Sequence, residues 1–265
     1  MGSYVQIGAL KTWYDEVGDE GDALVLLHGG IVTNETWGPQ LAELPSRFHV
    51  FAPERRGHGH TPDVDGPFSY AAMADDTIGF LETVAKGPAH LVGWSDGGII
   101  GLLIAIQRPD LVRKLVAISA NSDTDDTPAE MLEGLRSTPP DSDDMAMMRQ
   151  LYEAASPDGP AHWPVVFEKF LDMATNEPHI PSDELAKIAS PTLLISGDDD
   201  VISLEHTVSL YRAIPGAELA VVPGTSHCLA MEKPAIVNRL IVDFLENEPI
   251  QEMMPIRRVP AGAHP

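Results

Sequence analysis

One serine lies in a sequence pattern that can make its hydroxyl group a nucleophile. Ser95 is the third residue of Gly93-Trp94-Ser95-Asp96-Gly97, which follows one apolar run and precedes another. We expect the first run to form a strand and the second a helix, so that the turn between them raises the Ser95 hydroxyl above the sheet. Such a turn gives the serine a positive φ and crowds the residues two before and two after it, which favours glycine at both positions. The pattern therefore predicts Ser95 as a catalytic nucleophile.

A serine hydroxyl also needs a base, and the base needs an acid that orients it. His227 ends the loop 223–227, between a strand-like run and the final helical pattern. Asp198, Asp199 and Asp200 follow the preceding strand-like run, and only one of them can face His227. We predict that Asp200 fixes the imidazole tautomer, while the other two aspartates shape the turn or face water.

Attack on a carbonyl group creates a negatively charged oxygen, which fixed N–H donors must stabilise. One predicted donor is the backbone N–H of Asp96, directly after the nucleophile at the start of a helix. The other should come from the turn His28-Gly29-Gly30, most simply from Gly30, with Ile31 as the alternative. The turn can also be read as nothing more than a tight exit from the preceding strand. His28 is expected to hold this turn by hydrogen bonds.

These candidate residues all follow strand-like runs. Such runs occupy residues 23–27, 48–52, 89–92, 115–119, 192–196 and 219–222, and two N-terminal strands fit residues 4–7 and 11–15. Helical patterns at 70–85, 99–106, 204–213 and 235–245 lie between or after them. This alternation predicts an α/β fold with a mostly parallel sheet and helices on both faces. Ligands of such sheets bind at the carboxyl edge of the strands, where the candidate residues would meet.

Roughly 70 residues separate the strand-like runs at 115–119 and 192–196, far more than a simple connection needs. Helical patterns near 129–135, 143–155 and 163–174 predict a helical cap, residues 123–190, that covers Ser95 and supplies most apolar substrate contacts. The core would then comprise residues 1–122 and 191–250, with 251–265 as a flexible tail. Methionines of the cap could fill its core or form an adaptable wall for the substrate. They are Met131, Met145, Met147, Met148 and Met173.

Composition excludes several classes of function. The 265 residues carry a formal net charge of −23, which disfavours binding to nucleic acid and to anionic membrane surfaces. Cys228 is the only cysteine, so the chain forms no internal disulfide and no multi-cysteine metal site, and we expect no metal. No apolar run reaches about 18 residues, and no basic-then-apolar leader opens the chain. We expect a cytoplasmic protein, either a monomer or a homo-oligomer.

Five segments in this order resemble the α/β-hydrolase superfamily, over about residues 3–246. They are Leu27–Gly30, Arg55–Gly59, Gly93–Gly97, Gly197–Asp200 and Ser226-His227. The sequence of residues 91–98 and the later Ala120-Asn121 are similar to the valacyclovir-hydrolase (biphenyl-hydrolase-like) branch. The resemblance implies an α/β-hydrolase fold with a helical cap and a serine hydrolase that needs no cofactor. It also implies esters, lactones or related small acyl compounds as substrates.

The branch also suggests a second interpretation of Asp96. Its carboxylate could simply serve the helix N-terminus, where a negative charge is favourable. Alternatively, as the resemblance implies, it could bind a substrate ammonium group at the pocket floor, with Trp94 as a second substrate contact. Arg55 and Arg56 are expected to brace loops near the site rather than to bind an anion.

Sequence and resemblance together predict hydrolysis of a carboxylic ester or lactone through an acyl-enzyme. Ser95 in the nucleophile position disfavours relatives that attack with aspartate, and Ile31-Val32 after Gly30 differ from the prolyl aminopeptidase signature. Carbon–carbon-bond hydrolases share the serine triad and remain an alternative. A second alternative is a non-catalytic ligand receptor on the same fold.

Overall fold

The structure is a computed structural model that describes residues 2–127 and 129–248. The described residues form one eight-stranded sheet with the strand order β1-β2-β4-β3-β5-β6-β7-β8. The strands are β1 (Ser3–Ile7), β2 (Leu10–Val17), β3 (Ala23–Leu27), β4 (His49–Pro53), β5 (Ala89–Trp94), β6 (Val112–Ile118), β7 (Thr192–Gly197) and β8 (Glu218–Val222). β2 pairs antiparallel with β1 and β4, whereas the six strands from β4 to β8 run parallel. The predicted mostly parallel sheet is confirmed.

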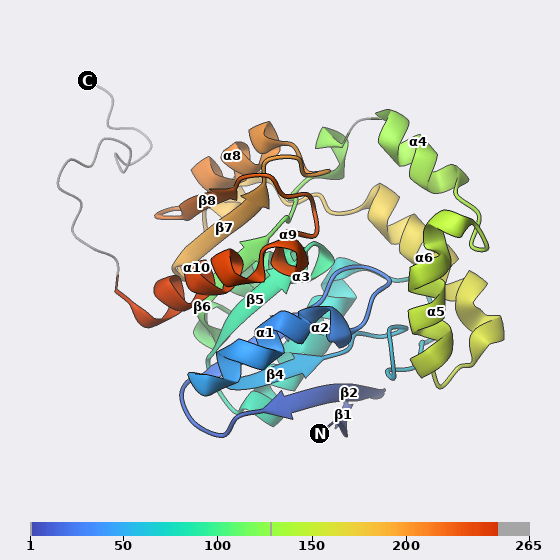
Figure 1. The fold of residues 1–265 in the computed structure, drawn as a ribbon, viewed down its shortest axis with the longest axis horizontal. Coiled ribbons are helices and arrows are strands. Elements are labelled where there is room, and N and C mark those ends of the chain that lie inside the picture. The colour runs from blue at the N-terminus through green and yellow to red at the C-terminus, as the bar shows by residue number, and fades with distance from the viewer. Residues whose placement is uncertain (1, 128, 249–265) are drawn as a thin grey trace.

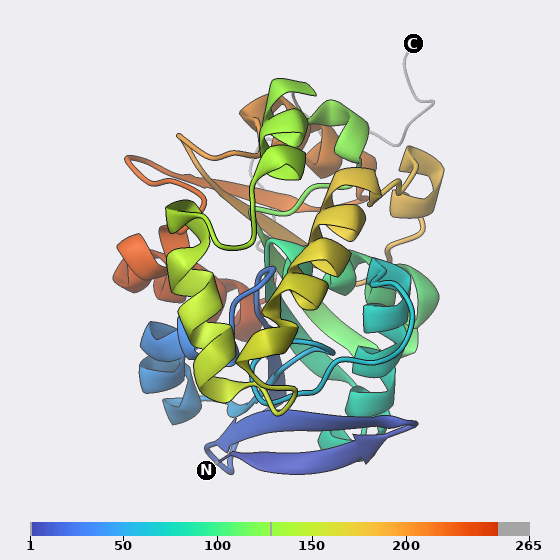
Figure 2. The same cartoon turned by 90° about the vertical axis from the view of Figure 1, so that its right-hand side faces the viewer.

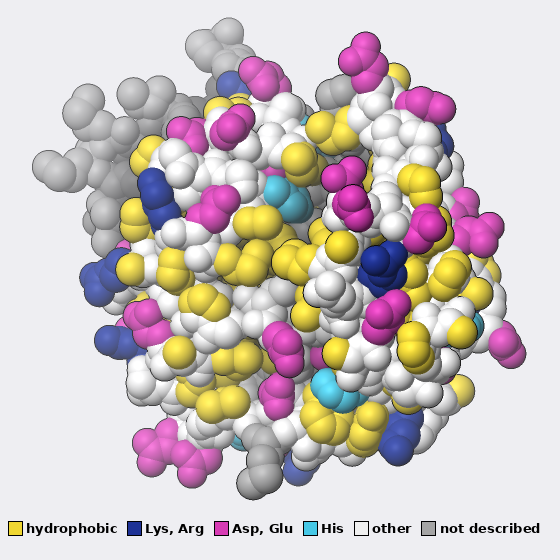
Figure 3. Space-filling model, turned by 45° about the vertical axis from the view of Figure 1, so that its right-hand side comes forward, with side chains coloured by type: hydrophobic (Ala, Val, Ile, Leu, Met, Phe, Trp, Pro, Cys, Tyr) yellow, Lys and Arg dark blue, Asp and Glu magenta, His cyan; other side chains and the backbone are white. Residues whose placement is uncertain are grey.

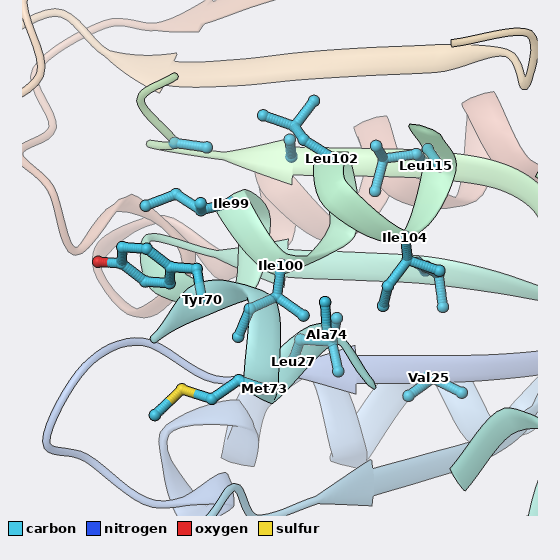
Figure 4. Packing of buried hydrophobic residues seen from close by; sticks show 14 of the residues in the cluster. Val25, Leu27, Tyr70, Met73, Ala74, Ile99, Ile100, Leu102, Ile104 and Leu115 are labelled. Carbon is cyan, nitrogen blue, oxygen red and sulfur yellow. The ribbon is translucent and has the colours of Figure 1, made fainter. Parts of the chain in front are cut away.

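Two hydrophobic clusters lie on opposite faces of this sheet, because side chains alternate along each strand. Val25 and Leu27 of β3 belong to the first cluster, and Leu24 and Leu26 to the second. The first cluster packs under α2 (Tyr70–Phe80), α3 (Asp96–Gln107) and α8 (Leu204–Ala213), as Figure 4 shows for part of it. The second lies under α1 (Gly38–Glu43) and α10 (Pro234–Glu246). Helices therefore cover both faces, as the sequence predicts.

Between β6 and β7 the chain forms α4 (Ala129–Ser137), α5 (Ala146–Ala155), α6 (Trp163–Asn176) and the short α7 (Ser182–Leu185). α4, α5 and α6 stand beside the sheet in Figure 1 and in front of it in Figure 2. We call residues 119–191 the cap segment. Its helices α4, α5 and α6 form a helical layer beside the sheet, whereas α7 packs against α8. Among the described residues of this segment, three of the four α-helices match the sequence prediction, and the four-residue α7 is too short to give a periodic signal.

The methionines of the cap segment do not share one environment. Met173 is buried, Met145 and Met148 are partly buried against the first cluster, and Met131 and Met147 are 43% and 60% exposed. The core-filling interpretation therefore holds for the first three and not for the exposed pair.

Several boundaries differ from the sequence expectation by one to three residues; β6, for example, begins at Val112 rather than at Leu115. α3 begins at Asp96, three residues earlier than its apolar pattern, because the glycines that follow Ser95 are helical as well. The helix that starts at Tyr70 ends its regular part at Phe80 and continues as a wider turn over Leu81–Ala85. Among the described residues, no helix is both long and apolar enough to cross a bilayer. The predicted tail, residues 251–265, lies outside the described residues.

Candidate active site

Ser95 occupies the turn between β5 and α3 with φ 56° and ψ −121°, a strained conformation for a residue with a side chain. Its backbone N–H donates to the Ile118 carbonyl at 2.8 Å, which ties the turn to β6. A Cβ added at Gly93 would collide with the backbone of Gly97, and one at Gly97 with the Leu27 carbonyl. The two glycines are thus required by close backbone contacts, as the motif predicts.

The structure brings His227 and Asp200 to Ser95 from two separate loops. The Nε2 atom of His227 lies 2.9 Å from the Ser95 Oγ, and its Nδ1 atom lies 2.7 Å from Asp200 Oδ1. An Nδ1–H donated to the carboxylate leaves the Nε2 lone pair facing the serine hydroxyl. This is the arrangement in which a histidine can remove the serine proton.

Asp200 is the one of the three neighbouring aspartates that faces His227. Its side chain is fully buried, and it also accepts hydrogen bonds from the Ser119 hydroxyl and the Ile202 backbone N–H. Burial alone would raise the pKa of Asp200, but the hydrogen bonds from His227 and Ser119 bring that pKa below its ordinary value. Asp198 instead accepts the Thr225 backbone N–H at 3.0 Å, and Asp199 is exposed. Of the three aspartates, Asp200 is thus the one that contacts His227, and its role as the acid stays a prediction.

Gly30 and Asp96, the two predicted oxyanion donors, lie next to each other. A Cβ added at Gly30 would lie 2.7 Å from Asp96 Oδ2, so the turn after β3 contacts the first residue of α3. As the first residue of a helix, Asp96 has a backbone N–H without a partner in the helix. The N–H of Ile31 donates to His58 Nε2 at 3.1 Å. Because Ile31 is engaged in this way, Gly30 is the better placed of the two candidates in this turn.

The Asp96 carboxylate is buried and faces other protein groups. Its Oδ1 accepts the Tyr70 hydroxyl at 2.9 Å, and its Oδ2 lies 3.7 Å from the Arg55 guanidinium. Burial raises the pKa of Asp96, whereas Arg55 and the Tyr70 hydrogen bond oppose that rise. Oδ2 is buried without a hydrogen-bond partner among the described residues. A counter-charge for Asp96 is therefore already present within the protein.

Trp94 is 8% exposed, and its indole N–H donates to the His227 carbonyl at 2.7 Å. A Cβ at Gly29 would lie 2.9 Å from the indole ring, so Trp94 also packs under the turn that carries Gly30. Through these contacts Trp94 supports both the loop that carries His227 and the turn that carries Gly30. Its predicted role as a substrate contact stays a prediction.

The sequence does not predict three residues of the candidate site. Ser119 has a positive φ of 52° and binds the acid, Tyr70 binds Asp96, and Phe170 of α6 contacts Gly30. The sequence could have indicated Ser119, because it directly follows β6, the strand next to β5. Tyr70 and Phe170 lie on helices, where each occupies an apolar position like any core aromatic residue.

The cap segment covers the site from the side of α6. The Phe170 ring lies against Gly30, and the exposed hydrophobic residues Val201, Leu204 and Met231 follow Asp200 and His227 in the chain. Figure 3 shows a hollow with hydrophobic side chains along its rim between two parts of the surface. A separate groove of about 690 Å³ is lined by Arg136, Lys169 and neighbouring residues, and no triad residue lines it.

A group of potential metal ligands joins two stretches of the cap segment and includes no residue of the predicted triad. Asp123, Asp125 and His179 have ligand atoms within 4.8 Å of one another, and His179 Nδ1 lies 2.8 Å from Asp123 Oδ1. The Asp123 carboxylate raises the pKa of His179 through this hydrogen bond. The two residues also pair through their backbones, because residues 123 and 179 form an isolated β-bridge that joins two stretches of the cap segment.

The described residues form an eight-stranded, mostly parallel sheet with a serine at a strained turn between a strand and a helix. This arrangement is typical of enzymes that use such a serine as a nucleophile. The alpha/beta hydrolase family matches residues 24–240, and the chain belongs to this family. The chain is 28% identical to "Serine hydrolase BPHL" of Homo sapiens over 253 residues, 91% of this chain and 85% of that protein.

Solved structures agree with this assignment. Est816, described as an N-acyl homoserine lactone degrading enzyme, has a TM-score of 0.73 and 26% identity, covering 91% of this chain and 100% of that chain. The enol-lactonase from Burkholderia xenovorans LB400 has a TM-score of 0.74 at 21% identity, over 92% of this chain and 100% of the other. The second likeness concerns the fold alone. The expected fold and the expected hydrolase class are confirmed.

Proposed function

We propose that this hydrolase cleaves a carboxylic ester or lactone through an acyl-enzyme formed on Ser95. The observation that carries the proposal is the continuous chain from Ser95 Oγ to His227 Nε2 at 2.9 Å and from His227 Nδ1 to Asp200 Oδ1 at 2.7 Å. The relative named as a serine hydrolase supports a serine nucleophile, and the solved structure described as a lactone-degrading enzyme supports a lactone substrate. The partner would be a small molecule, and a cytoplasmic location stays a prediction from the sequence.

In the first half of the reaction, Ser95 Oγ attacks the substrate carbonyl carbon while His227 Nε2 takes the serine proton. The buried Asp200 carboxylate stabilises the imidazolium ion that forms. The N–H groups of Gly30 and Asp96 hold the oxyanion until the bond to the leaving oxygen breaks, and the imidazolium protonates that oxygen. Water then attacks the acyl-enzyme by the same route, and Ser95 is regenerated.

The proposal favours a neutral acyl group, because Asp96 already has Arg55 as its counter-charge. Wild-type enzyme should therefore hydrolyse an ester with an α-amino group and its matched neutral ester with kcat/KM values within about threefold of each other. A preference above about tenfold for the amino ester would place Asp96 in substrate binding instead, since one desolvated ion pair contributes that much.

Turnover of p-nitrophenyl acetate and of a small lactone tests the triad. Ser95→Ala, His227→Ala and Asp200→Asn should each lower kcat by about 10³-fold or more, and the losses should not add. Asp198→Asn is the matched control for Asp200→Asn and should stay within a few-fold of wild type. Full activity of Ser95→Ala would contradict the proposal. Turnover of a vinylogous diketone, but of no ester or lactone, would favour the carbon–carbon hydrolase instead.

A further inference from the structure

The loop after β4 buries a cation behind the turn that carries Gly30. The Arg55 side chain is 4% exposed, and its Nη2 donates to the Gly29 carbonyl at 2.7 Å. Its Nη1 donates to the His28 carbonyl. A buried guanidinium that binds two successive carbonyl groups fixes the orientation of both peptide planes. The predicted support of a loop near the site is thus a direct contact of Arg55 with the turn His28-Gly29-Gly30, which we call the oxyanion turn.

The Gly29 carbonyl belongs to the same peptide group as the Gly30 N–H. It accepts a second hydrogen bond from His28 Nδ1 at 2.8 Å. His28 must carry its proton on Nδ1, because the Arg55 backbone N–H donates to Nε2 at 3.2 Å. Burial and the neighbouring Arg55 hold the pKa of His28 well below its ordinary value, so the ring is neutral at pH 7.

Two donors on one carbonyl polarise its peptide group and strengthen the N–H at the other end as a donor. That N–H is the predicted oxyanion donor of Gly30. A cation behind the peptide group also favours negative charge in front of it, and the effect is large where water is excluded.

The same cation faces the side chain of the second oxyanion residue. Arg55 Nη2 lies 3.7 Å from Asp96 Oδ2, and Tyr70 donates to the other carboxylate oxygen. An uncompensated carboxylate beside a developing oxyanion would oppose the reaction. Arg55 supplies the opposite charge, so the Asp96 side chain can lie there at little cost to the transition state.

We propose that Arg55 is a positioning residue of the oxyanion hole. It orients and polarises the Gly29–Gly30 peptide group and compensates the charge of Asp96. The proposal rests on the proposed function, because it assumes that the oxyanion forms at Gly30 and Asp96 during attack by Ser95.

The test compares the affinity for a trifluoromethyl ketone with the KM of a matched ester. The hemiketal that Ser95 forms with this ketone carries the oxyanion. Arg55→Gln should lower kcat and the affinity for the trifluoromethyl ketone in parallel, each by about 10- to 100-fold, because one direct oxyanion donor contributes about 10²–10³. KM should change less than threefold. Arg55→Lys keeps the charge but replaces the planar fork of two nitrogens by a single nitrogen, so it should retain an intermediate kcat and affinity.

Arg56→Gln is the matched control. Arg56 is the next residue of the same loop, but its guanidinium pairs with Asp76 at 2.7 Å and does not reach the oxyanion turn. This variant should lower the melting temperature and leave inhibitor affinity within about twofold of wild type. The double variant Arg55→Gln/Asp96→Asn should recover part of the Arg55→Gln loss, because the uncompensated charge is gone.

An Arg55→Lys variant that melts like wild type and binds the trifluoromethyl ketone as tightly as wild type would overturn the proposal. Equal losses in inhibitor affinity for Arg55→Gln and Arg56→Gln would overturn it as well. Failure of the proposed function gives a different result, since Ser95→Ala would then keep wild-type turnover whatever Arg55 does.

Discussion

At the scale of single residues, the site depends on backbone conformations that are costly for side chains. Ser95 and Ser119 both have positive φ values, 56° and 52°, and each directly follows one of two neighbouring parallel strands, β5 and β6. The first places the Ser95 hydroxyl against His227, and the second turns the Ser119 hydroxyl toward Asp200. Strain of this kind persists where the surrounding structure enforces it, and it gathers at functional sites.

Ser119 is therefore expected to support the acid. Ser119→Gly should lower kcat about tenfold with KM unchanged, because Asp200 loses one donor while its carboxylate stays buried. Ser119→Ala should lower kcat equally but melt at a lower temperature than Ser119→Gly, since alanine is strained at positive φ. Kinetics and thermal melts of both variants check this. Unchanged kcat in both would remove Ser119 from the mechanism.

At the scale of elements, the carboxyl edge of the sheet gathers residues that are far apart in the sequence. β3 leads to Gly30, β5 to Ser95, β7 to Asp200 and β8 to His227. The cap segment leaves this edge after β6, and its α6 places Phe170 against Gly30. The acyl pocket is thus expected to be bounded by α6.

Phe170→Ala should enlarge this pocket. We expect the ratio of kcat/KM for a bulky branched-chain ester to kcat/KM for the acetate ester to rise about tenfold. A change of this size is typical when an apolar pocket changes size. Phe167→Ala is the control, because Phe167 is buried in the first hydrophobic cluster and its loss should lower stability first. A ratio that Phe170→Ala leaves unchanged would place the acyl group elsewhere.

The sequence predicts most of the elements but not all of the site. Alternating strands and helices are encoded by local apolar patterns, so β3 and α8 begin and end where expected. Ser95 and His227 are marked by motifs at strand ends. Arg55 could be assigned near the turn but not to particular carbonyl groups, because that contact joins loops 26 and 27 residues apart. The contacts of Tyr70 and Phe170 depend in the same way on tertiary packing.

At the scale of the whole molecule, the negative charge lies mainly outside and several neutral histidines lie inside. His28 and His58 are buried in the loops behind the oxyanion turn. Burial, with Arg55 nearby, lowers the pKa of His58 to about 3. Its Nε2 accepts the Ile31 N–H, so the neutral ring is the form that fits the fold.

These histidines should make the protein sensitive to acid. In the unfolded chain an imidazole binds a proton below about pH 6.5, whereas folded His58 does so only near pH 3, so the free energy of unfolding falls as pH decreases through this window. His58→Gln should reduce the slope of unfolding free energy against pH by about 1.4 kcal/mol per pH unit between pH 4 and 6. Urea denaturation at several pH values measures this slope.

His179 provides a control of opposite sign. Its pKa is raised by Asp123, so its contribution to stability is present at low pH and is lost as pH rises through the folded pKa. His179→Gln should therefore leave the slope between pH 4 and 6 unreduced. An unchanged slope in His58→Gln would mean that His58 binds a proton in the folded protein near its ordinary pKa.

The central claim is that Ser95 forms a covalent bond to the substrate. Reaction with a p-nitrophenyl alkylphosphonate, followed by intact-mass measurement and peptide mapping, tests it most directly. We predict one phosphonyl group per chain, located on Ser95, with release of one equivalent of p-nitrophenol, and no adduct in Ser95→Ala. An adduct on another residue, or ester turnover by a wild-type enzyme that the phosphonate neither labels nor inhibits, would contradict the account.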